Sequence, residues 1–399
     1  MRTSIQVGTL IGIPIRLHFT FLFILVGIIG GFATLPATEY RVPLGLGGIP
    51  MSPFVRYSLA TAAAVLFFFT LLLHEMSHSY VAMKFGTKIH SITLFFFGGL
   101  AMMEDLPKSP REEWRIAIAG PLMSFALGGL FLLTSWLLKL ATLIFGVPAS
   151  VLRPVTILVF SLGFLNVGLG VFNLVPAFPL DGGRVFRAFL ATRMPFLKAT
   201  KRAVLVGKIF AVVMAVGGFL ADPITFFLRG EVVSGNFWFP LLAVFLFIAA
   251  TEEENATATF AALEGVKVRD VMRTERTSVP EGATVAEVAK KMLEERTVEF
   301  AVVSEGGELR GFVTWEDIKK VRPEQHLTAL DVVARAERGG GAAFESVEEF
   351  VFAEEAAAVA LKKMMKSRRK VLAVRDAVSG EFVGIITRRD LSDYIEMLR

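Results

Sequence analysis

Long apolar segments fill the first 250 residues and restrict this chain to the folds of membrane proteins. A helix needs about 20 consecutive apolar residues to cross the hydrocarbon core of a bilayer. Hydrophobic residues make up 54% of the 399-residue chain, and 37 residues are phenylalanine, which is more than ordinary soluble proteins carry. We therefore expect a polytopic α-helical membrane domain with about six transmembrane helices. The predicted spans lie near residues 17–36, 57–82, 115–145, 154–176, 203–220 and 236–251.

Lysine and arginine residues are concentrated in two of the loops between the predicted spans. The loops after the second and fourth spans are rich in them, whereas the loops after the first, third and fifth spans hold few. Because positively charged loops stay in the cytoplasm, we expect a multi-pass protein of the cell membrane with both termini in the cytoplasm. The net charge of +5 follows from this topology, and no nucleic-acid partner is expected.

The composition changes at the sequence TEEENATATFAALEG, residues 251–265, which we interpret as a linker after a membrane domain of residues 1–250. The rest of the chain reads as a soluble α/β region with an internal repeat. GFVTWEDIKK begins at Gly311, and GIITRRDLSD begins at Gly384. The chain has no cysteine, so disulfides and thiolate metal sites are excluded.

The sequence HEMSH places His74, Glu75 and His78 inside the second predicted span. Residues four apart lie on the same face of a helix, so the two imidazoles can bind one metal ion. Glu75 stands beside them and can take a proton from a metal-bound water. The alternative is a chance match, but ionisable side chains are costly inside a membrane span and usually mark function. We therefore predict a metal site here.

A catalytic zinc site with an open position for water needs a third protein ligand. The other histidines, His18, His90 and His326, lie at the start of the first span, in a loop and in the soluble region, so a carboxylate must serve. Asp181 is the best candidate, because prolines end the fourth span and turn the chain back toward the bundle. A surface position at a helix end is the alternative. Against it, the fourth span has a small and polar face that must look into the bundle, formed by Gly163, Asn166, Gly170 and Asn173.

The sequence SITLFFFGGLAMM places Gly98 and Gly99 between two apolar runs. This pattern predicts a membrane-dipping β-hairpin whose free edge pairs with an extended substrate strand. An interfacial hairpin without a role in substrate binding would show the same pattern.

Four motifs in this order resemble the site-2 protease family of intramembrane zinc metalloproteases. They are HEMSH, GGL at residues 98–100, EEWRIAIAGPL at residues 112–122 and FNLVPAFPLDGGR at residues 172–184. The resemblance covers about residues 1–250. It implies that His74, His78 and Asp181 bind one zinc ion per chain and that Glu75 is the general base. It also implies that Asn173 lies near the scissile peptide bond and contacts its carbonyl.

The repeat resembles a pair of cystathionine-β-synthase-type (CBS) domains, at residues 266–323 and 324–399. The resemblance implies an adenine nucleotide, ATP or AMP, as a regulatory ligand, and a homodimer formed through these domains. The family's ribose and phosphate contacts match Thr314 with Asp317, and Thr387 with Asp390. The alternative is that each pair only caps the helix that follows it.

Together these features predict an intramembrane zinc endopeptidase that cleaves a transmembrane or membrane-adjacent segment of a substrate protein within membrane lipid. Two other functions are weighed against it. A CBS-regulated transporter or channel would repeat charged or broken segments in two halves of its membrane region, and no such duplication is seen. A non-catalytic membrane sensor would have lost Glu75 or a metal ligand, and this sequence has all of them.

Overall fold

The computed structural model divides into two compact units, Met1–Asn255 and Ala256–Arg399, which are described separately. The residues that the structure describes are 4–37, 42–96, 98–103, 109–145, 147–222, 235–274, 278–295, 297, 299–306, 308–321, 327–338, 350–367 and 371–397.

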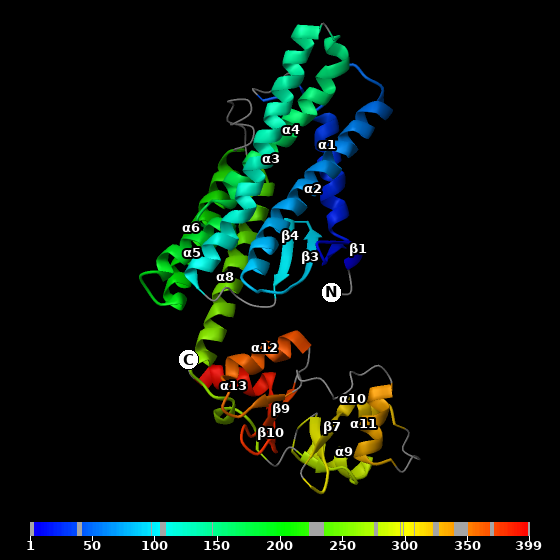
Figure 1. Cartoon of the computed structure of the whole chain (residues 1–399), viewed down its shortest axis with the longest axis vertical. Helices are drawn as coiled ribbons and strands as arrows, with labels where there is room; N and C mark the ends of the chain where they lie inside the picture. The colour runs from blue at the N-terminus through cyan, green and yellow to red at the C-terminus, as the bar shows by residue number, and fades with distance from the viewer. Residues whose placement is uncertain are drawn as a thin grey trace. The chain divides into compact units, whose positions relative to one another are not determined.

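Helices dominate the first unit (Figure 1). Four helices within the described residues are long and apolar enough to cross a membrane. Large apolar side chains on their outer faces, such as Leu133, Trp136 and Val213, are exposed, as expected for contact with lipid. The fold is therefore that of a polytopic membrane protein. The helices of this unit are α1 (Phe21–Thr34), α2 (Pro53–Lys84), α3 (Pro110–Phe145), α4 (Ala149–Asn173), α5 (Asp181–Ala191), α6 (Phe196–Leu220) and α8 (Trp238–Glu264), whose residues from 256 onward belong to the second unit.

Two of the six predicted spans differ from the prediction. The first is the 14-residue helix α1, which is shorter than a full span, because the residues up to His18 form a β-strand instead. The sixth is only the apolar beginning of α8, which continues through the glutamates at 252–254 to Glu264. Residues 251–264, predicted as part of a linker, are thus helical.

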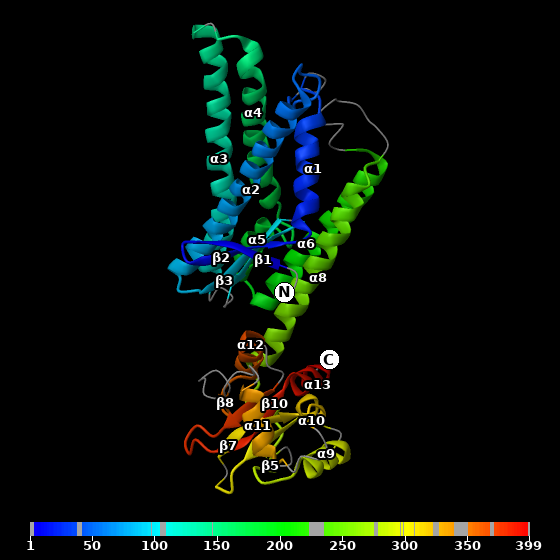
Figure 2. The same ribbon diagram turned by 90° about the vertical axis from the view of Figure 1, so that its right-hand side faces the viewer.

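A four-stranded sheet packs against α2 (Figure 2). Its order is β1-β2-β3-β4, with β2 and β3 parallel and the other pairs antiparallel. Ile13, Ile15 and Ile92 of the sheet bury Met76 of α2, which lies within the HEMSH motif. The predicted hairpin is present as β3 and β4, and β4 is an edge strand. The strands are β1 (Ser4–Leu10), β2 (Ile13–His18), β3 (Ile89–Phe95) and β4 (Gly98–Met103).

Helices α3 and α4 run side by side (Figure 2) and meet through small residues. A Cβ atom added at Gly128 of α3 would lie 2.7 Å from the Val167 side chain, and one at Gly163 of α4 would lie 2.8 Å from Leu132. Asn166 is fully buried on the same helix. The glycines therefore allow the two backbones to approach closely, as small residues do in membrane helix pairs.

A tight turn joins α4 to α5. Helix α4 ends at Asn173, and α5 begins at Asp181 after a proline-containing turn. Gly182 lies against the carbonyl oxygens of Leu174 and Val175, each 2.3 Å from the position that a Cβ atom would take. Any larger residue would push the start of α5 away from this turn, so the turn fixes where Asp181 stands.

The second unit contains two three-stranded sheets with matching topology, ordered β5-β6-β7 and β8-β9-β10. In each sheet the first two strands are parallel and the last two antiparallel. This duplication agrees with the internal sequence repeat. The elements are η1 (Val268–Asp270), β5 (Ser278–Pro280), α9 (Val285–Glu294), β6 (Glu299–Val303), β7 (Leu309–Thr314), α10 (Trp315–Lys319), α11 (Ala329–Arg338), β8 (Phe350–Phe352), α12 (Ala357–Ser367), β9 (Val371–Arg375), β10 (Phe382–Thr387) and α13 (Arg388–Met397).

Candidate metal centre

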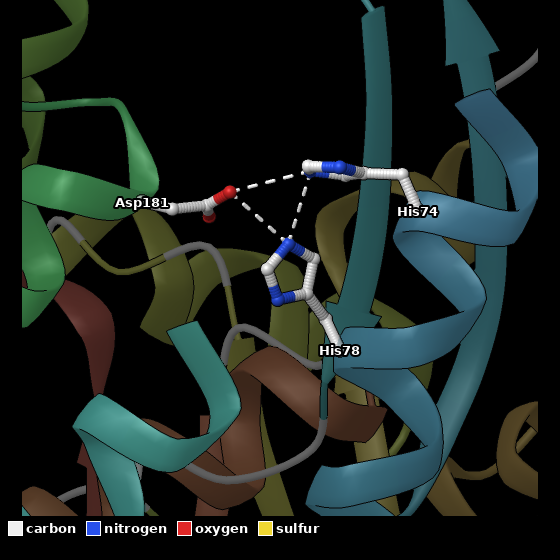
Figure 3. A group of neighbouring side chains, drawn as sticks. All are labelled: His74, His78 and Asp181. Atoms are coloured by element: carbon white, nitrogen blue, oxygen red, sulfur yellow. Dashed lines mark hydrogen bonds and ion pairs between the residues drawn. The ribbon is translucent and has the colours of Figure 1, made fainter. Parts of the chain in front are cut away.

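Three side chains converge between α2 and the start of α5. Figure 3 shows His74 and His78, one turn apart on α2, pointing at the carboxylate of Asp181. The Oδ2 atom of Asp181 lies 3.3 Å from Nε2 of His74 and 3.2 Å from Nε2 of His78, and the two Nε2 atoms are 3.2 Å apart. Within the described residues these three form the one group able to hold a metal ion.

The other ring nitrogens of the histidines are bound to α3. Nδ1 of His78 lies 2.7 Å from the carbonyl oxygen of Ile116. A carbonyl only accepts, so this Nδ1 carries the proton and Nε2 of the neutral ring keeps a lone pair. Nδ1 of His74 lies 2.8 Å from Oγ of Ser124, a hydroxyl oxygen that can accept a hydrogen bond from Nδ1 in the same way. Such partners fix the orientation and tautomer of metal-ligating histidines.

In the tautomers with the proton on Nδ1, the two Nε2 atoms and Oδ2 of Asp181 are three electron-pair donors that face one another. Oδ2 of Asp181 is buried and accepts no hydrogen bond from the described residues. Buried lone pairs that face one another are unfavourable unless a cation lies between them. Ligand atoms around a tetrahedral zinc ion are about 3.3 Å apart, which matches the separations here. Two imidazoles and one carboxylate are also a ligand set of catalytic zinc sites, so these residues fit zinc.

Gly120 of α3 leaves the space that an ion at this place needs. A Cβ atom at position 120 would lie 2.1 Å from Nε2 of His78 and 2.6 Å from Nε2 of His74. Ile116 and Gly120 belong to the motif EEWRIAIAGPL and Ser124 follows it, but the sequence pattern assigned none of the three a role. Their spacing holds a usable signal: Ile116, Gly120 and Ser124 follow one another at intervals of four and share one face of α3.

Glu75 follows His74 on α2 and faces the sheet. A Cβ atom at Gly99 of β4 would lie 2.3 Å from Cγ and 2.8 Å from Oε1 of Glu75. The edge strand therefore packs directly on the side chain that was predicted as the base. Gly98 is the first residue of the same strand.

The side chain of Asn173 hydrogen-bonds within its own helix and not to the three candidate ligands. It is the last residue of α4, and its side-chain amide donates to the carbonyl of Leu169, 3.0 Å away in the same helix. To contact a substrate carbonyl, this amide would have to leave Leu169.

The two threonine and aspartate pairs of the second unit both form capping boxes. Thr314 accepts a hydrogen bond from the backbone of Asp317 and donates to its Oδ2, 2.5 Å away. Thr387 and Asp390 make the same pair of contacts, with 2.7 Å between the hydroxyl and Oδ2. The capping role considered above is thus present in both repeats. The copies differ, because Oδ1 of Asp390 also pairs with the guanidinium of Arg273 at 2.6–2.7 Å.

Comparison with known proteins decides the family. The model of peptidase family M50 matches residues 62–215, and the model of the CBS domain matches residues 268–324. Zinc metalloprotease MJ0392 of Methanocaldococcus jannaschii is 34% identical over 320 residues, which cover 80% of each chain. The chain belongs to peptidase family M50. Rip3 of Mycobacterium tuberculosis is 32% identical over 332 residues, covering 82% of this chain and 78% of Rip3.

A solved structure gives a further comparison. The site-2 protease from Methanocaldococcus jannaschii is 36% identical and covers 63% of this chain and 95% of its own, with a TM-score of 0.41. As an M50 peptidase with a CBS region, the protein is a zinc metalloprotease. Its apolar helices make it a multi-pass membrane protein. The alternatives of a transporter, a channel or a non-catalytic sensor are not favoured by these findings.

Proposed function

We propose that this protease cleaves a peptide bond in a transmembrane or membrane-adjacent segment of another membrane protein. In this proposal His74, His78 and Asp181 hold one zinc ion per chain, and Glu75 is the general base. One observation carries it: the carboxylate of Asp181 meets the two histidines beside Glu75 on α2, a helix long enough to span a membrane.

Different residues carry out different steps of the proposed peptide-bond hydrolysis. Zinc held by His74, His78 and Asp181 would supply a Lewis acid, which polarises a carbonyl and lowers the pKa of a bound water. Glu75 takes a proton from that water as its oxygen bonds to the carbonyl carbon, and then passes the proton to the amide nitrogen as the carbon–nitrogen bond breaks. The amide of Asn173 donates a hydrogen bond to the carbonyl oxygen as negative charge develops there.

The edge strand β4 is the proposed docking site for substrate. An extended segment that pairs with the free edge of β4, at Gly98 and Gly99, would run beside Glu75, because Gly99 packs on that side chain. A helix hides its peptide bonds, so a transmembrane substrate must unwind locally before it can pair. Segments weakened by Gly, Pro or Asn are therefore the favoured substrates.

We also propose that an adenine nucleotide, ATP or AMP, binds to the CBS pair and alters proteolysis without being consumed. The contacts would come from Thr314 with Asp317 and Thr387 with Asp390, and a homodimer through the CBS domains is the proposed assembly. A ligand shifts activity only if it binds two arrangements of the protein with different affinity. We further propose that the N-terminus and the CBS region both lie in the cytoplasm.

The test is a cleavage assay on purified full-length protein with candidate membrane substrates, with and without ATP and AMP. The proposal predicts cleavage by the wild type, loss of cleavage on zinc chelation, recovery on zinc addition, and a rate that changes with nucleotide. Cleavage that resists complete zinc removal would contradict the zinc mechanism. Saturable nucleotide binding with an unchanged rate would leave the CBS pair without a regulatory role.

A further inference from the structure

A buried arginine outside the metal centre has no part in the reaction described above. Arg187 lies on α5, six residues after Asp181, and only 1% of it is exposed. A buried guanidinium is costly unless it is paired and hydrogen-bonded. The partners of the Arg187 guanidinium therefore indicate the structural role of this charge.

Arg187 pairs with two glutamates from two other helices. Its Nε lies 2.8 Å from Oε1 of Glu113 on α3, and its Nη2 is also bonded to that oxygen. Its Nη1 lies 2.7 Å from Oε1 of Glu253 on α8. The planar guanidinium can serve both partners at once because its donors form a rigid fork. Arg187 thus ties α5 to α3 on one side and to α8 on the other.

Two aromatic rings lie against the same guanidinium. The centroid of Phe178 lies 4.8 Å from Cζ of Arg187, and that of Phe196 lies 4.7 Å from it. Phe178 belongs to the turn that leads into α5, three residues before Asp181, and is buried. Cation–π contacts with two rings restrict movement of the side chain. Arg187 therefore holds the turn before Asp181 as well as the helix after it.

The arginine cluster and the metal centre share two helices. Glu113 and Gly120 are seven residues apart, about two turns, so they lie on one face of α3. Gly120 packs on the two histidines, while Glu113 holds Arg187. On α5, Asp181 contacts the histidines beside Gly120, and Arg187 contacts Glu113. A shift of α5 along α3 would therefore break the ion pair and displace the carboxylate from the histidines.

We propose that Arg187 is a positioning residue, whose ion pairs with Glu113 and Glu253 hold Asp181 at bonding distance from a zinc ion on His74 and His78. The proposal rests on the zinc site of the proposed function, but it concerns metal affinity and not cleavage. It assigns a role to the acidic segment of α8 as well, because Glu253 supplies one of the two anions.

Glu253 has neighbours that serve as matched controls. Burial alone would raise the pKa of Glu253, but Arg184 and Arg187 outweigh it and hold that pKa below its usual range, so the carboxylate is charged at neutral pH. Glu252 is exposed. Glu254 is partly buried like Glu253, but it pairs with Lys208 of α6, 3.0 Å away, and not with α5.

The experiment measures zinc affinity by competition with a chromophoric chelator, on the purified full-length chain. Glu253→Gln is expected to weaken zinc binding about tenfold, as changes in groups that orient metal ligands do. Glu252→Gln and Glu254→Gln are expected to bind zinc like the wild type. Arg187→Lys keeps the positive charge but loses the forked arrangement of guanidinium donors, so its zinc affinity should fall as well. If Arg187→Lys does not fold, the result for Glu253→Gln decides the question.

Cobalt spectra of the same variants separate positioning from general loss of structure. Glu253→Gln should still bind Co²⁺ but with a shifted ligand-field absorption, because the carboxylate is displaced and not lost. Zinc affinity in Glu253→Gln equal to that of the wild type would overturn the proposal, as would an equal loss in Glu254→Gln. A wild type that binds zinc tightly and cleaves no membrane protein would refute the proposed function while leaving this inference standing.

Discussion

At the scale of single residues, the metal centre depends on which nitrogen of each histidine carries the proton. The carbonyl of Ile116 and the hydroxyl of Ser124 hold Nδ1 of His78 and His74, which leaves both Nε2 atoms for a metal. These partners lie 38 and 50 residues away along the chain. The HEMSH spacing predicted the ligand pair because its geometry is local to one helix, but it holds no information about distant partners.

Gly120 gives the sharpest prediction at this scale. Alanine is a better helix former than glycine by about 1 kcal/mol, so Gly120→Ala should leave α3 intact. Its methyl group would nevertheless lie between the two histidines, and zinc affinity should fall by more than about a hundredfold.

The matched control is Gly129→Ala on the same helix, where a Cβ atom would meet nothing within 4 Å. Zinc analysis of the purified variants makes the comparison. Zinc bound equally well by Gly120→Ala and Gly129→Ala would show that α3 does not border the metal.

At the scale of elements, the sequence predicted the helices and turns that depend on neighbouring residues, but not the strand pairing that depends on distant ones. The glycine pair in SITLFFFGGLAMM marked the hairpin of β3 and β4, and the prolines after Asn173 marked the end of α4. The hairpin of β1 and β2 was not predicted, and part of β2 was assigned to the first span. Its position depends on parallel pairing of β2 with β3, more than 70 residues later, and such pairing leaves no local trace.

The capping boxes of the second unit predict unequal effects of two aspartate substitutions. Asp317→Ala removes the half of its capping box that the carboxylate supplies, worth about 0.5 kcal/mol, while Thr314 still caps the helix. Asp390→Ala removes the equivalent half and also the ion pair with Arg273, so it should destabilise its helix by about 2 kcal/mol. Hydrogen exchange in the full-length protein measures this as faster exchange at the start of α13 than at the start of α10. Equal increases in both helices would show that the Arg273 pair contributes nothing.

At the scale of the whole molecule, composition indicated a membrane region followed by a soluble region, because hydropathy is a sum over many residues, and the matching motifs at Gly311 and Gly384 indicated the repeat. The number of helices that span the membrane could not be fixed in this way. Short apolar segments such as that in α1, and apolar segments that run on into charged ones, as in α8, have similar hydropathy whether or not they cross.

The absence of cysteine makes the topology directly testable. Pro50 and Lys198 are both exposed, so a single cysteine at either position can react with a membrane-impermeant thiol reagent. The distribution of Lys and Arg predicts that Lys198→Cys reacts only from the cytoplasmic side and Pro50→Cys only from the opposite side. Reaction of both from one side would show that an odd number of spans, predicted as three, does not separate the two positions.

The central claim is that zinc binding and proton transfer are the work of different residues in one site. It is tested most directly by measuring bound zinc and substrate cleavage together in Glu75→Gln and Asp181→Ala. Glu75→Gln should keep about one zinc ion per chain, because Glu75 is no ligand, while cleavage falls by about 10²- to 10⁴-fold. Asp181→Ala should lose both. Full cleavage by Glu75→Gln, or undiminished zinc in Asp181→Ala, would contradict the account.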